Sequence, residues 1–129
     1  EYKVLSSSLS EDTEMGYIKL TKNEEENMNV FIDKMGIHVA RLGKGGSMIF
    51  LSCGKYITTD KAYILYLRDS FKKEVCIDDS EKEEKFLKWF IENYQNLLYT
   101  FAPKTANSAW NKTNFMKEAI IDVPNINKI

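Results

Sequence analysis

The chain has 129 residues, 43% of them hydrophobic and 29% charged, and a formal net charge of −1 at pH 7. These values are ordinary for one globular domain. Apolar runs fall well short of the roughly 20 residues of a membrane span, and the first residues lack the basic flank and apolar core of a signal peptide. We therefore expect a single domain covering residues 1–129, cut from a longer cytoplasmic protein with no membrane partner.

The first half of the chain predicts strands and turns. Residues 6–16 are polar and turn-rich, YIKL (17–20) alternates like a short strand, residues 21–29 are polar, and VFI (30–32) is too short to assign. From Gly36 the pattern sharpens into IHVAR, the turn GKGGS, the returning strand MIFLS, a second turn in CGKYITTD and the strand KAYILYLR. Branched and aromatic runs between glycine-rich turns are typical of a β meander of three or more strands.

Residues 78–100 predict a long amphipathic helix. Ser80 followed by Glu83 matches a capping box, and further acids crowd the first turn, where the helix dipole favours them. Apolar residues then recur at helical spacing and end before Pro103: Phe86, Leu87, Phe90, Ile91, Tyr94, Leu97 and Leu98. Such a broad apolar stripe belongs against a core.

The C-terminal part predicts a polar loop at 102–113 that holds one aromatic, a single helical turn NFMKE (114–118) and a short strand AIIDVP (119–124). The whole chain therefore predicts an α+β fold. We expect one compact domain with a mainly antiparallel, strongly curved sheet and a long amphipathic helix near the C-terminal half.

Although the net charge is small, acidic and basic residues are concentrated in different segments of the chain. Residues 1–35 carry eight acids against four bases, residues 41–73 carry seven bases against two acids, and residues 74–95 carry seven acids against three bases. A basic middle between acidic flanks suggests a local anion-binding face, although charge runs are also common on solvated surfaces.

Reactive chemistry is hard to place on this sequence. GKGGS lacks the G-K-[ST] of a nucleotide-binding P-loop, and Met48 stands where a dinucleotide fingerprint needs glycine. His38 is the one histidine and sits inside an expected strand, where a structural role is the ordinary interpretation. Cys53 and Cys76 have no partner at metal-ligand or redox spacing, so we interpret them as buried free thiols. The sequence favours a binding protein with neither cofactor nor metal over an enzyme.

Cations and small hydrogen-bonding groups gather around the expected turns and the late polar loop. Glycines permit positive φ and expose backbone amides, which suits contact with phosphates, while asparagine pairs with adenine edges and an exposed tryptophan stacks on bases. Trp110 has an equal alternative as a plug for the core. The predicted DNA-contacting residues are Arg41, Lys44, Gly45, Ser47, Lys55, Thr58, Thr59, Lys61, Lys104, Asn107, Trp110, Asn111 and Lys112.

The order of these segments resembles the target recognition domain of the specificity subunit of type I restriction–modification systems, which also occurs in related fused restriction enzymes. Three stretches carry the likeness: EYKVLSSSLSEDTEMGYIKL, IHVARLGKGGSMIFLSCGKYITTDKAYIL, and KWFIENYQNLLYTFAPKTANSAWNKTNFMKEAIIDVPNI. The second holds a G-x-x-G turn between strands, and the third ends in I-x-x-P.

This resemblance implies sequence-specific recognition of double-stranded DNA. Each such domain reads one half of a split target, while partner methyltransferase and restriction subunits do the chemistry. S-adenosylmethionine would then be bound by the methyltransferase, where base flipping and methylation also occur. The domain itself would carry neither a cofactor nor a catalytic residue.

Two alternatives remain open from the sequence. One is a protein-interaction module without a nucleic acid partner, which the acidic flanks permit. The other, ranked last, is a nucleotide-binding enzyme resting on GKGGS alone. If about six phosphates are contacted, log K for random duplex should fall against log[salt] with a slope of about −5.

Overall fold

The computed structural model describes residues 2–5, 17–19, 21–22, 30–42, 44–59, 61–102 and 109–129. In this part of the chain, a five-stranded sheet has the order β2-β1-β4-β3-β5. The strands are β1 (Tyr2–Leu5), β2 (Tyr17–Ile18), β3 (Val30–Ala40), β4 (Met48–Thr58) and β5 (Ala62–Leu65). The helices are α2 (Asp69–Glu74), α3 (Ser80–Tyr99) and α4 (Lys112–Glu118), and a 3₁₀ turn η2 (Ile126–Lys128) lies near the end.

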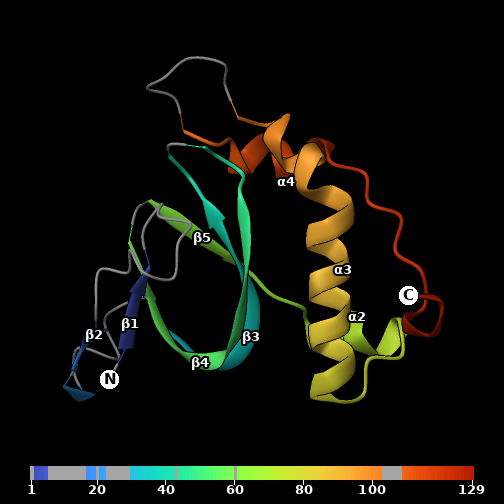
Figure 1. The fold of residues 1–129 in the computed structure, drawn as a ribbon, viewed down its shortest axis with the longest axis horizontal. Coiled ribbons are helices and arrows are strands. Elements are labelled where there is room, and N and C mark those ends of the chain that lie inside the picture. Colours follow the sequence, from blue (N-terminus) through green and yellow to red (C-terminus); the bar gives the residue numbers. More distant parts are fainter. Residues whose placement is uncertain are drawn as a thin grey trace.

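The pairing confirms the predicted α+β class with a mainly antiparallel sheet. The pairs β1–β2, β3–β4 and β3–β5 are antiparallel, and β1 pairs with β4 in parallel. Figure 1 shows the strands on one side of the molecule and α3 standing beside them, with α4 at one end of α3 and α2 at the other. The segment after α4 returns along the outside of α3 toward α2.

The sheet bends sharply where β3 and β4 lose their regular register. The register shifts between Ile32 and Lys34 and again between Lys34 and Gly36. Asp33, inside this irregular stretch, has a φ of 53°. Extra residues in one strand of a pair bend it and increase its twist, and Asp tolerates the left-handed region better than most residues. The far half of β4 can therefore turn away and pair with β1 (Figure 1).

The face of the sheet toward α3 holds the main core. Ile37 and Val39, two residues apart on β3, point to this face together with Met48 of β4. The apolar stripe of α3 supplies Leu87, Phe90 and Leu98, which confirms the expected packing of this helix against a core. A smaller cluster of Leu51, Tyr56 and Ala62 fills the inside of the bend, and a third of Val75, Ile77, Phe86 and Ile126 joins α2, α3 and η2.

Several element boundaries differ from the sequence-based expectation. β3 already begins at Val30, and β4 runs through Gly54 to Thr58 where a turn was predicted. The predicted strand KAYILYLR ends at Leu65, and α2, which was not predicted, begins at Asp69. The predicted strand at 119–124 is irregular, because this segment packs beside α3 and not on the sheet (Figure 1).

The long helix begins one residue away from the predicted cap. Asp79 is the N-cap, and its carboxylate accepts a hydrogen bond from the Lys82 N–H at 2.8 Å. Ser80 is therefore the first helical residue and the predicted capping box was wrong. Glu83 instead forms an ion pair with Lys72 of α2 at 2.6 Å. The Lys82 ammonium donates to Asp78 at 2.6 Å, and this hydrogen bond lowers the pKa of the Asp78 carboxyl.

Cys53 and Cys76 are free thiols, as predicted, but both are exposed and not buried. Cys53 lies in the bent stretch of β4, and Cys76 follows α2 with a φ of 65°. Among the helices of the described part of the chain, none has the length and apolar character that crossing a membrane requires.

Gly36 supplies a stability test of the bend. A Cβ at this position would lie 2.8 Å from the Leu65 carbonyl oxygen and 2.9 Å from Cγ2 of Ile64, so β5 would have to move away from β3. We expect Gly36→Ala to lower the free energy of unfolding by about 1–3 kcal/mol, measured by urea denaturation. Ser52→Ala, at an exposed position of β4, should change it by less than about 0.5 kcal/mol. Equal small effects would contradict the close approach of the two strands.

Candidate nucleic-acid interface

The glycine-rich segment forms the tip of the β3–β4 hairpin, and backbone hydrogen bonds within the segment hold it. The Ala40 N–H donates to the Ser47 carbonyl at 3.0 Å, and the Gly46 N–H returns to the Ala40 carbonyl at 2.8 Å. Gly46 has a φ of 91°, which favours glycine. The glycines of this turn were expected to expose their amides for phosphate contact, but the Gly46 N–H is engaged inside the tip.

Gln95 of α3 holds this tip from the side. Its Oε1 accepts a hydrogen bond from the Met48 N–H at 2.8 Å, and its Nε2 donates to the Gly46 carbonyl at 2.8 Å. One amide side chain therefore satisfies a donor and an acceptor at the start of β4. The hairpin tip is fixed against the C-terminal half of α3.

Trp110 packs against the glycines of the tip. Its side chain is 2% exposed, and the indole N–H donates to the Leu98 carbonyl at 2.8 Å. A Cβ on Gly46 would meet Nε1 of the same indole at 2.9 Å, and a Cβ on Gly45 would meet the Trp110 Cβ at 3.1 Å. Trp110 is therefore the core plug that the sequence left open as an alternative, and its prediction as a base-stacking residue is corrected.

Ser47 is also internal. Its side chain is 3% exposed, and its hydroxyl donates to the Lys44 carbonyl at 2.7 Å and lies 3.2 Å from the Tyr99 hydroxyl. Gly45 is buried as well. Both were predicted to contact DNA, and their burial against α3 and Trp110 corrects that prediction.

Three segments far apart in the sequence meet beside the tip. The Arg41 N–H donates to the Lys61 carbonyl at 3.0 Å, and the Trp110 N–H donates to the Arg41 carbonyl at 2.7 Å. Arg41, at the end of β3, thus joins the start of β5 to the segment that leads into α4. We call the four cations carried by these segments the basic end: Arg41, Lys44, Lys61 and Lys112.

Two cations of the basic end lie over aromatic rings. The Lys44 ammonium is 4.9 Å from the centre of the Tyr99 ring, and the Lys112 ammonium is 5.5 Å from that of Tyr63. Both lysines are exposed, as is Lys61, and Arg41 is half-buried. A cation–π contact orients an ammonium group while leaving its other side in water.

The remaining predicted residues divide between nearby and separate positions. Thr59 is next to the basic end, since its hydroxyl accepts a hydrogen bond from the Lys61 N–H at 3.2 Å. Thr58 pairs with Leu5 at the end of β4. Lys55 is exposed and pairs with Ile32 beyond the bend, and it is not one of the four cations of the basic end. Lys104 and Asn107 lie outside the described residues.

Asn111 has a structural task that the sequence-based prediction did not include. It is the N-cap of α4, and its Oδ1 accepts a hydrogen bond from the Asn114 N–H at 2.9 Å. Its side chain is nevertheless exposed and adjoins Lys112 of the basic end. A capping oxygen and an outward amide are compatible, because a carbonyl oxygen carries two lone pairs and the NH₂ group donates separately.

Gln95 and Tyr99 were missed from the sequence. They are four residues apart on α3, so they share one side of the helix with Ile91. An amide within an apolar stripe is the signal that was available, because a buried polar group needs a partner. The sequence did not show which backbone groups that partner would be.

Reactive groups are sparse in the described part of the chain. There, no cluster of three His, Cys, Asp or Glu side chains is arranged to hold a metal ion. His38 is 3% exposed and lies on β3, the strand between β4 and β5.

Comparison of the chain with models of protein families, with curated proteins and with solved structures found no match.

Gln95 gives a direct test of how the tip is held. Gln95→Met keeps the length of the side chain but leaves the Met48 N–H and the Gly46 carbonyl without this partner. We expect a loss of about 2 kcal/mol in the free energy of unfolding, measured in urea. Asn96→Met, at the exposed neighbouring position of α3, should be close to neutral. Equal losses for both variants would contradict the role given to Gln95.

A second substitution at this position should make stability depend on pH. In Gln95→Glu the introduced carboxylate can still accept from the Met48 N–H, but it faces the Gly46 carbonyl oxygen. That repulsion raises the pKa of the introduced carboxyl, so its protonated form is favoured in the folded state. The deficit relative to the parent should therefore shrink as pH falls from 7 to about 4, followed by thermal unfolding. A deficit that grows on acidification would contradict this geometry.

Proposed function

We propose that the chain recognises double-stranded DNA and directs a partner methyltransferase and restriction assembly to one half of a bipartite target. The observation that carries the proposal is the basic end. The described residues of 40–48, 61–63 and 109–113 contain its four cations and no acid. Their backbones are joined by hydrogen bonds, so the positive charges of three segments belong to one end of the molecule.

The basic end suits phosphate contact because its lysines are exposed on a backbone that hydrogen bonds hold in place. The hairpin tip is held by hydrogen bonds from Gln95 and by packing on Trp110. Lys44 on the tip, Lys61 before β5 and Lys112 at the start of α4 are all exposed. Phosphate contacts position a protein on DNA, and release of counterions by Lys and Arg supplies much of the affinity. In the bent sheet, the hairpin tip, the start of β5 and the start of α4 lie at the same end of the molecule (Figure 1).

Base reading is assigned to the polar groups that adjoin these cations. Asn111 is exposed beside Lys112, and its amide can pair with the N6 and N7 edge of adenine while its oxygen also caps α4. The resemblance in sequence supplies the rest of the proposal: a non-catalytic domain in the cytoplasm whose partner binds S-adenosylmethionine. Methylation and cleavage belong to that partner.

The first test is the salt dependence of binding. Four phosphate contacts predict that log K for random duplex falls against log[salt] with a slope of about −3.6, at about −0.9 for each phosphate. Fluorescence anisotropy with a labelled duplex of random sequence measures this slope. A flat response would rule out phosphate contact.

Charge reversal locates the contact. The combined change Lys44→Glu, Lys61→Glu and Lys112→Glu should reduce the slope to about −1 and weaken binding to every sequence alike. The matched control reverses three exposed lysines of α2, the N-terminal part of α3 and η2: Lys73→Glu, Lys85→Glu and Lys128→Glu. It alters net charge equally and should retain more than half of the slope. If both triple variants lose binding to the same extent, the basic end is not the contact surface.

Asn111→Ser separates base reading from capping. Serine also caps helices, so α4 should keep its stability to within a few tenths of a kcal/mol. The variant loses the bidentate amide and should lose about 1–3 kcal/mol of binding on one preferred base, with little change on other sequences. Binding to a panel of duplexes with single base changes measures this. The same loss on all sequences would contradict the assignment of Asn111 as a reader.

One observation favours the alternative of a protein-interaction module. Met116 is 66% exposed and Ile120 is 85% exposed, and they lie four residues apart at the end of α4. An apolar pair beside the basic end fits contact with another protein as well as with DNA. Loss of a protein partner on Met116→Gln with Ile120→Gln, together with no measurable DNA binding at low salt, would favour this alternative.

A further inference from the structure

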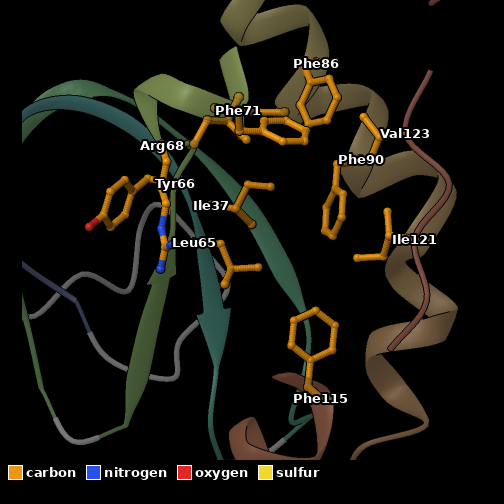
Figure 2. A pocket seen from close by; sticks show the side chains of 12 residues that line it. Ile37, Leu65, Tyr66, Arg68, Phe71, Phe86, Phe90, Phe115, Ile121 and Val123 are labelled. Carbon is orange, nitrogen blue, oxygen red and sulfur yellow. The ribbon is translucent and has the colours of Figure 1, made fainter. Parts of the chain in front are cut away.

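An apolar cavity of about 350 Å³ lies between the sheet, α3 and the C-terminal segment. Figure 2 shows Ile37 and Leu65 on the sheet side, the rings of Phe86 and Phe90 on the α3 side, and Phe115 of α4 at one end. Ile121 and Val123 lie over it from the segment that returns along α3 (Figure 2). The lining is therefore assembled from elements distant in sequence.

The cavity is open to solvent and falls within the usual size range of ligand pockets, about 300–1,000 Å³. An apolar cavity of roughly 150 Å³ is already large enough to bind benzene. At roughly 30 Å³ for each non-hydrogen atom, by analogy with liquid water, the space holds about a dozen atoms. This is the size of a binding site for a small molecule.

One charged residue lines this apolar space. Arg68 lies at the end of the segment that leaves β5, on the strand side of the cavity (Figure 2). Arg68 is exposed, and among the described residues its guanidinium forms neither an ion pair nor a hydrogen bond. The nearby acids Asp69 and Glu83 are both within ion-pair distance of Lys72. The other polar lining residue is Tyr66, which is 51% exposed. The lining thus combines an apolar interior with a single positive charge.

We propose that this cavity binds a small amphiphile with an apolar body of about eight to ten carbons and a carboxylate that pairs with Arg68. The aromatic and aliphatic lining takes the apolar body and removes it from water. The guanidinium offers a planar pair of donors that matches a carboxylate, and the lining of the cavity itself holds no acid. On its other side Arg68 adjoins Asp33, Asp69 and Glu83, which share that surface with Lys34 and Lys72. This site is separate from the basic end and does not depend on DNA binding.

Titration of the whole chain with decanoate, hexanoate, decanol and decylamine, each below its micelle concentration, tests this proposal by calorimetry. Decanoate should bind one to one, and hexanoate should bind roughly 200-fold more weakly, from about fourfold for each of four methylenes. Decanol and decylamine should bind at least about tenfold more weakly than decanoate. Equal binding of the four compounds, or no binding of any, would overturn the proposal.

Two variants assign the binding to this cavity. Arg68→Leu should weaken decanoate about tenfold and leave decanol within about twofold, whereas Lys73→Leu, on the same α2 region but outside the lining, should change neither. Val123→Trp fills the space and should abolish binding of both. If Val123→Trp does not fold, the Arg68 comparison still decides. Unchanged decanoate binding in Arg68→Leu would overturn the pairing with the carboxylate.

Discussion

The amide of Gln95 is the contact on which the position of the hairpin tip depends. It bonds at once to the Met48 N–H and the Gly46 carbonyl, so the tip of the β3–β4 hairpin takes its place against α3. Trp110 completes the same junction by donating to the Leu98 carbonyl and filling the space under Gly46. These are buried or half-buried polar bonds, where loss of one partner costs more than the bond itself is worth.

This junction separates two kinds of group. Residues whose polar atoms are used inside it, such as Ser47 and Gly46, turn away from solvent and hold the backbone. The cations beside them extend outward and carry the proposed function. A glycine-rich segment rich in lysine can therefore serve as a support for charge without forming a phosphate cradle from its own amides.

The sequence predicted what local chemistry decides and missed what distant contacts decide. The stripe from Phe86 to Leu98 predicted α3 and its buried face, and the branched residues around GKGGS predicted the hairpin, since both patterns are local. It left Trp110 open between a plug for the core and a base-stacking residue, because the choice depends on the meeting of α3, β3 and the segment before α4. The length of β4 was also missed, since continuation through Gly54 depends on its pairing with residues of β3 beyond a bulge.

The candidate site shows the same division. The closeness of Arg41 and Lys44 is visible in the sequence. Lys61 and Lys112 join them only through backbone hydrogen bonds from Arg41 to segments about 20 and 70 residues further along the chain. The most direct measurement is the change in backbone amide NMR shifts when a duplex is added at low salt. The account predicts changes centred on residues 41–47, 61–63 and 109–113, with α2 and the first turns of α3 unaffected. Changes centred on α2, or none at all, would contradict it.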